Sequence, residues 1–248
     1  MEPEPADPAP TATTRPPRWG LGDFLLGLVV GLTLSSLMAA LWFAVSDDQE
    51  LGLAGQALSQ VGLWTGMVGS VVLASHRKGA GRLSKDFGFK ARWSDIALGV
   101  AVALAAQLVI LPAVGLLLRP LLGHPKVSQP VQDLIDKAHG PAYFGLVLSV
   151  ALGAPVVEEL FFRGLLLGAL RRRVNDGLAI AISGVAFGLA HGSSLPADAV
   201  ILVMVSLTVF GAMLAALAIR TGRLGPGIVA HAAFNLFTVL YLTFHKGG

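Results

Sequence analysis

The sequence consists largely of long apolar runs that are separated by short segments rich in lysine and arginine. A helical run of about 20 apolar residues matches the hydrocarbon thickness of a bilayer. Charged residues make up only 13% of the chain, whereas they make up about a quarter of an average soluble domain. We therefore predict an all-α fold, a polytopic transmembrane helix bundle that forms one membrane domain over residues 20–248.

Seven apolar runs are the expected transmembrane helices, and they cover residues 21–45, 51–75, 96–118, 142–170, 178–190, 197–219 and 224–244. The helical spacing of Val131, Leu134, Ile135 and Ala138 predicts an additional short amphipathic helix on the membrane surface before the fourth run. Residues 1–19 are rich in proline and alanine, so we expect a disordered N-terminal tail on the cytoplasmic side.

The distribution of basic residues predicts the orientation of the bundle. With the N-terminus in the cytoplasm, thirteen lysines and arginines lie in cytoplasmic segments and four in outer segments. This bias follows the positive-inside rule and places the C-terminus outside the cell membrane. Because the cations cluster between apolar runs, the net charge of +3 indicates membrane orientation rather than nucleic-acid binding. The chain has no cysteine, which excludes disulfides, thiolate metal sites and a cysteine nucleophile.

The fifth apolar run is too short to cross a bilayer. Thirteen residues extend about 20 Å as an α-helix, against a hydrocarbon core of about 30 Å. The run is followed directly by His191. A helix that ends early is tolerated where the irregular backbone lines a cavity inside the protein. We therefore expect His191 to lie below the membrane surface, while Gly184 and Gly188 allow this helix to approach a neighbour closely.

Ionisable residues inside transmembrane segments indicate a functional site, because burying them in lipid is costly. Glu158, Glu159 and Arg163 lie in the fourth run. Glu159 and Arg163 are four residues apart with the acid first, which favours an ion pair on a helix. Glu158 points about 100° away and is left without a local cation. An acid in that position readily accepts a proton and suits the role of a general base. A purely structural ion-pair network is the alternative interpretation.

The seventh run carries His231 and Asn235, which face the same side of a helix because they are four residues apart. Neutral histidine and asparagine can donate hydrogen bonds to an oxyanion. They can equally hydrogen-bond between helices, and His191 can be a helix-terminal histidine with an ordinary partner. Phe187, one turn before His191, is expected to pack in the core. The run Arg171-Arg172-Arg173 is expected to set topology.

Three motifs follow one another on successive apolar segments, Glu158-Glu159-x-x-x-Arg163, Phe187-x-x-x-His191 and His231-x-x-x-Asn235. In this order they resemble the CPBP family of intramembrane proteases, also called the CAAX protease or Abi family, which includes the Rce1 prenyl-protein endopeptidases. The resemblance covers about residues 140–245. It implies that Glu158 activates water with help from His191, that His231 and Asn235 stabilise the oxyanion, and that Glu159 and Arg163 support the first motif.

The resemblance thus implies an intramembrane endopeptidase that acts on a membrane-associated protein or peptide. No cofactor is assigned, and a metal-free, glutamate-type hydrolase is favoured. Zinc is the alternative, in which case Glu158, His191 and His231 would be its ligands, although the usual His-Glu-x-x-His helix is absent. Two other functions stay open: a non-catalytic role in immunity, scaffolding or regulation, and a transporter or proton relay. The substrate and the oligomeric state do not follow from the sequence.

Overall fold

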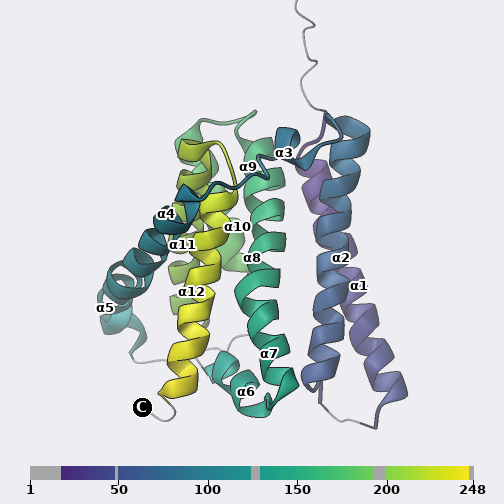
Figure 1. The fold of residues 1–248 in the computed structure, drawn as a ribbon, viewed down its shortest axis with the longest axis vertical. Coiled ribbons are helices and arrows are strands. Elements are labelled where there is room, and N and C mark those ends of the chain that lie inside the picture. Colours follow the sequence, from purple (N-terminus) through teal and green to yellow (C-terminus); the bar gives the residue numbers. More distant parts are fainter. Residues whose placement is uncertain (1–17, 48–49, 124–128, 193–198, 246–248) are drawn as a thin grey trace, which may run out of the picture.

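The structure is a computed structural model that describes residues 18–47, 50–123, 129–192 and 199–245. All regular secondary structure in these residues is helical. Most of the expected N-terminal tail, residues 1–17, lies outside the described part. Figure 1 shows a bundle in which the segment α7 to α9 stands in the centre, the hairpin of α1 and α2 lies on one side, and α4 and α5 lean outward on the other.

Six helical segments are long and apolar enough to cross a membrane. They are α1 (Leu21–Val45), α2 (Leu53–Lys78), the continuous segment Ser94–Leu122, the continuous segment Pro141–Leu170, α11 (Val200–Thr221) and α12 (Gly225–Phe244). The protein is thus an all-α, multi-pass membrane protein, as predicted. The fifth expected helix is α10 (Asp176–Ala190), which has only 15 residues and ends immediately before His191.

Two of the long segments are not regular α-helices. The segment Ser94–Leu122 consists of α4 (Ser94–Ala105), a π-helical turn η1 (Ala106–Ile110) and α5 (Leu111–Leu122). The segment Pro141–Leu170 contains two such stretches, and its parts are α7 (Pro141–Leu148), η2 (Ser149–Gly153), α8 (Ala154–Glu158), η3 (Glu159–Leu166) and α9 (Leu167–Leu170). Such π turns are frequent at functional sites, and here the longest begins at Glu159.

Two short helices flank the long segments. α3 (Leu83–Asp86) lies in the connection between α2 and α4. The predicted amphipathic helix is α6 (Gln129–Lys137), which lies across one end of the bundle below α7 and α12 (Figure 1). Its Ile135 and the following Ala138 are buried, and Ile135 packs with Val239 and Leu242 of α12. An apolar face directed at the bundle explains the helical spacing in the sequence.

The close approach of α10 to α11 depends on the two glycines that the sequence indicated. A Cβ on Gly184 would lie 2.7 Å from the carbonyl oxygen of Thr208, and a Cβ on Gly188 would collide with the side chain of the same threonine. Small residues are the usual means of close packing between membrane helices. The expectation for Gly184 and Gly188 is therefore confirmed.

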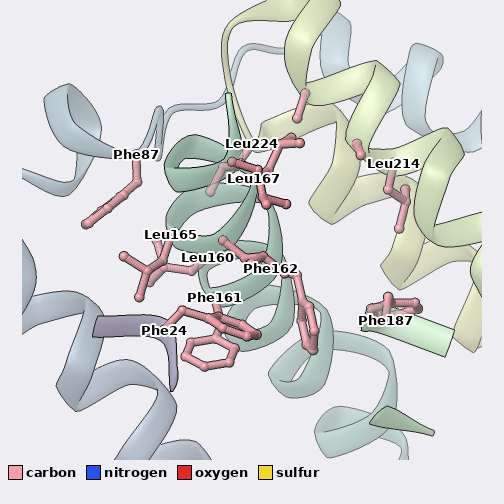
Figure 2. Packing of buried hydrophobic residues seen from close by; sticks show 14 of the residues in the cluster. Phe24, Phe87, Leu160, Phe161, Phe162, Leu165, Leu167, Phe187, Leu214 and Leu224 are labelled. Atoms are coloured by element: carbon pink, nitrogen blue, oxygen red, sulfur yellow. The ribbon is translucent and has the colours of Figure 1, made fainter. Parts of the chain in front are cut away.

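Aromatic side chains fill the core around the central segment. Phe161 and Phe162 of η3 are buried, and Phe24 of α1 stacks on Phe161 with ring centroids 4.5 Å apart (Figure 2). On the other side, the ring of Phe187 lies edge-on to Phe162 at 5.4 Å. These contacts join α1, η3 and α10, so the segment that carries Glu158 and Glu159 is held between both halves of the chain.

The junctions α2–α4, α9–α10 and α11–α12 meet at one end of the bundle, which we call the basic end (Figure 1). Trp19, which the sequence placed in the tail, is buried there and lies 4.7 Å from the ring of Phe87. The guanidinium of Arg172 covers the Trp19 ring at 3.9 Å. Arg172 therefore anchors the start of α1 in addition to any role in setting topology, because cations bind well to the face of an indole.

Candidate active site

Glu158 and Glu159 lie where α8 changes into the π-helical stretch η3. Each residue of η3 is buried, including Glu159 and Arg163. Pro155, three residues before Glu158, has no backbone N–H and so interrupts the regular helical ladder. The motif thus lies at an irregular point of the central segment, where neighbouring helices surround it.

Glu159 and Arg163 form the ion pair that their spacing predicted. Oε1 of Glu159 lies 2.9 Å from Nη1 of Arg163, and neither side chain is exposed. Arg163 also donates a hydrogen bond from Nη2 to the carbonyl of Gly211 in α11 at 3.0 Å, and its guanidinium lies 4.3 Å from the centre of the Phe187 ring. A buried charge needs such partners to be tolerated. This pair therefore joins η3 to α10 and α11.

Glu158 faces two histidines from different helices. Its Oε2 lies 3.7 Å from Nε2 of His191, which follows α10, and 3.8 Å from Nε2 of His231 on α12. The side chains of Glu158 and His191 remain 15% and 33% exposed, whereas those of Glu159 and Arg163 are fully enclosed. Glu158 and His191 therefore keep some accessible surface, whereas Oε2 of Glu158 itself is buried and has no hydrogen-bond partner among the described residues.

The hydrogen bond of His191 fixes the direction of its ring. Its Nδ1 lies 2.8 Å from the carbonyl oxygen of Phe187. A carbonyl can only accept, so Nδ1 carries the proton, and in the neutral ring Nε2 is an acceptor. Oε2 of Glu158 is an acceptor as well. A water molecule, with two hydrogens to donate, has the chemistry that this pair of acceptors requires.

His231 lies between both acids of the first motif. While its Nε2 faces Glu158, its Nδ1 lies 3.4 Å from Oε1 of Glu159. Gly227, one turn earlier on α12, leaves the space that the Glu159 carboxylate occupies next to His231. A Cβ at this position would lie 2.7 Å from Oε2 of Glu159. The imidazole of His231 is 4% exposed, so it contacts the site from within the core.

Asn235 donates a hydrogen bond from Nδ2 to the carbonyl of Val150 in η2 at 2.8 Å. The carbonyl of Val150 is free to accept this bond because no backbone N–H of its own helix pairs with it. In the π turn the N–H of Ala154 bonds to Ser149, and the next residue, Pro155, has no N–H to offer Val150. Asn235 therefore joins α12 to the central segment, and its amide nitrogen retains a second hydrogen for another acceptor.

Phe187 has a larger part in the site than its spacing suggested. Its buried ring lies 4.6 Å from the ring of His191 and 5.5 Å from that of His231, in addition to its contact with Arg163. The expectation that it packs in the core is correct, but the core at this position is the wall of the polar cluster. Phe187 lies four residues before His191, so the sequence already placed the two side chains on the same face of the helix.

Metal binding was the alternative interpretation of Glu158, His191 and His231. Within the described ranges, no group of three His, Cys, Asp or Glu side chains is arranged to hold a metal ion. Zinc requires ligand atoms at about 2.0–2.2 Å from the ion, in a tetrahedral arrangement. Zinc binding by Glu158, His191 and His231 therefore stays an alternative prediction from the sequence, and the proposed reaction uses only the side chains themselves.

Comparison with known families agrees with this geometry. Residues 140–237 match the family described as type II CAAX prenyl endopeptidase, Rce1-like. The matched segment is thus similar to the Rce1-like family. It contains Glu158, Glu159, Arg163, His191, His231 and Asn235.

One relative supports the same assignment. Over 120 residues the chain is 32% identical to the protein named "Putative membrane peptidase YdiL" from Bacillus subtilis (strain 168). The match covers 48% of this chain and 46% of that protein, so the chain spans about half the length of this relative. No solved structure matches the chain significantly. The similarity to the Rce1-like family therefore rests on the part of the chain that carries the motifs.

Proposed function

We propose that this protein is an intramembrane endopeptidase that hydrolyses a peptide bond in a membrane-associated protein or peptide, with Glu158 as the general base. The observation that carries the proposal is the approach of Nε2 of both His191 and His231 to the same oxygen of Glu158, at 3.7 and 3.8 Å. Positioned acids and imidazoles of this kind are the usual means of moving protons during hydrolysis.

In the proposed reaction, a water molecule donates hydrogen bonds to Glu158 and to Nε2 of His191. Glu158 takes one proton from the water as its oxygen attacks the carbonyl carbon of the substrate. The resulting oxyanion accepts hydrogen bonds from Nε2–H of His231 and from the second amide hydrogen of Asn235. Glu158 then gives its proton to the leaving nitrogen as the C–N bond breaks. The products are a new carboxylic acid, which keeps the second hydrogen of the water, and a new amine.

Glu159 and Arg163 have a supporting role in this proposal. Their ion pair is fully enclosed, so neither can contact a substrate in the observed arrangement. Glu159 instead approaches Nδ1 of His231 at 3.4 Å, which helps to set the direction of the ring so that Nε2 faces Glu158. The two adjacent acids therefore divide into one that faces the reacting water and one that orients a neighbour.

We further propose that the basic end of the bundle faces the cytoplasm, and that the C-terminal end of α12 lies on the outer side. The support is the excess of lysine and arginine at the junctions of that end, which is the feature that orients membrane proteins. Because the site lies within the central segment, the substrate would be cleaved inside the membrane domain rather than in either aqueous compartment.

The test compares Glu158→Gln with Glu50→Gln in otherwise identical cells. Both variants exchange a carboxylate for an amide, but Glu50 is an exposed residue in the α1–α2 connection. New protein termini in isolated membranes are quantified by mass spectrometry. We expect a set of new termini that is present in cells with the wild type or Glu50→Gln and absent from cells with Glu158→Gln. If every terminus persists with folded Glu158→Gln, a non-catalytic role is the better interpretation.

A further inference from the structure

A hollow at the basic end lies beside the connection between α3 and α4. It has a volume of about 150 Å³ and is lined by Phe89, Lys90, Ala91, Gly225, Ile228 and Val229. Most of these side chains are apolar, and Lys90 is the one cation among them. The hollow contains none of the residues of the candidate active site, so it requires an explanation of its own.

Backbone hydrogen bonds hold this hollow in shape. The N–H of Leu224 bonds to the carbonyl of Gly88 at 2.8 Å, and the N–H of Gly225 bonds to the carbonyl of Lys90 at 3.0 Å. Gly88 has a positive φ of 67°, which lets the chain turn back toward α12. The connection before α4 is thus fixed against the start of α12, and the hollow lies between two ordered segments.

The side chains around the hollow match the interfacial region of a bilayer. Trp93 is 90% exposed, and Phe89 is 38% exposed. Exposed tryptophan next to lysine and arginine is typical of residues that lie at the level of lipid headgroups. Lys90 and Arg92 are exposed on the same connection, immediately before the transmembrane helix α4 begins. An apolar hollow bordered by cations offers space for an acyl chain and charge for a phosphate.

The carboxylates of the basic end do not neutralise these cations. Asp23 pairs with Lys78, Asp95 with Arg223, and Asp176 with Arg171. Asp86 accepts hydrogen bonds from Ser75 and from the backbone. The exposed cations of this end that form no ion pair within the described ranges include Arg77, Arg82, Lys85, Lys90, Arg92 and Arg220. This surface therefore complements a negatively charged leaflet.

We propose that the hollow lined by Phe89, Lys90 and Val229 is a binding site for one anionic phospholipid of the adjacent leaflet. Lys90 and Arg92 bind the phosphate and headgroup, and the upper part of an acyl chain enters the hollow beside Ile228 and Val229. Because the same residues contact the start of α12, the bound lipid stabilises the helix that carries His231 and Asn235. The site is separate from the proposed peptidase chemistry and does not depend on it.

The experiment uses the full chain in a neutral detergent and titrates it with phosphatidylglycerol or with phosphatidylcholine of identical acyl chains. Native mass spectrometry resolves the bound lipid. We expect the first phosphatidylglycerol to bind more tightly than phosphatidylcholine. The variant Lys90→Gln/Arg92→Gln should weaken that first binding by roughly tenfold or more, because each cation near a headgroup contributes about a fivefold factor.

Two further variants separate a defined site from general attraction. Arg82→Gln/Lys85→Gln removes the same charge from exposed positions that do not line the hollow, and should change the first binding less than threefold. Ala91→Phe fills the hollow without changing charge, and should also abolish the preference. Glycerol phosphate, which lacks acyl chains, should not compete. Equal effects of both charge variants, unchanged binding by Ala91→Phe, or no preference between the two lipids would overturn the proposal.

Discussion

At the scale of single residues, the two adjacent acids of the first motif differ in what surrounds them. Glu159 is enclosed and paired with Arg163, whereas Glu158 keeps part of its surface and faces two imidazoles. The helical offset between neighbouring residues produces this division. Spacing alone predicted the ion pair correctly, and the pair persists although η3 is π-helical. The predicted catalytic roles stay proposals, since geometry alone does not test them.

The buried ion pair leads to a prediction about stability. Arg163→Met leaves Glu159 without its cation in the core, so we expect a loss of roughly 3–5 kcal/mol in the free energy of unfolding. Adding Glu159→Gln removes the unpaired charge and should restore part of that loss. Unfolding in detergent, followed by circular dichroism, measures both variants. A double variant that is less stable than Arg163→Met alone would contradict this account of the pair.

A second residue-scale prediction concerns the space that Gly227 leaves for Glu159. Gly227→Ala places a methyl group 2.7 Å from Oε2 of Glu159 and should displace the acid from His231. We expect at least a tenfold loss of cleavage rate, since small displacements in a catalytic site are costly. The matched control is Gly145→Ala on α7, where no atom lies within 4 Å of the added methyl group. Similar effects of both variants on the rate would refute the positional role of Gly227.

At the scale of the elements, apolar length and spacing predicted the helices well. The first expected run and α1 have the same bounds, the short fifth run became α10, and the amphipathic spacing became α6. The three π-helical stretches were not predicted, because their signals are local. Pro155 lies beside η2 and Pro112 beside η1, but neither proline by itself distinguishes a kink from a π turn. The contact of Asn235 with Val150 depends on η2 and was therefore also missed.

The link between Asn235 and η2 can be tested with a double-mutant cycle. Asn235→Ala leaves the carbonyl of Val150 without its donor, which should cost about 1–3 kcal/mol in the free energy of unfolding. Pro155→Ala supplies a backbone N–H that can bond to the same carbonyl. In the Pro155→Ala background, Asn235→Ala should therefore cost less than in the wild type. Equal costs in both backgrounds, measured by unfolding in detergent, would show that Asn235 does not act through Val150.

At the scale of the whole molecule, the chain forms a multi-pass bundle with unequal ends. Cations gather at the basic end, where they also anchor Trp19 through Arg172. The sequence predicted the clusters from their position between apolar runs. It did not predict the burial of Trp19, because a tryptophan after a proline-rich stretch carries no periodic signal. Contacts between segments far apart in the chain, such as this one, require the folded arrangement.

The proposed orientation can be measured directly because the natural chain has no cysteine. Lys85→Cys places a thiol in α3 at the basic end, and Asp47→Cys places one in the connection after α1, at the opposite end. In intact cells, a membrane-impermeant maleimide should label Asp47→Cys and spare Lys85→Cys until the membrane is opened. The reverse pattern would invert the proposed topology, although it would leave the arrangement of the site unchanged.

The most direct test of the peptidase proposal is the rate of a single cleavage in purified protein. A substrate captured by Glu158→Gln is reconstituted in vesicles with the wild type, Glu158→Gln or Glu50→Gln, and the new amino terminus is followed over time. We predict that Glu50→Gln cleaves at the wild-type rate and that Glu158→Gln is slower by about a hundredfold or more, at equal substrate binding. A folded Glu158→Gln protein that cleaves within threefold of the wild type would contradict the assignment of Glu158 as the base.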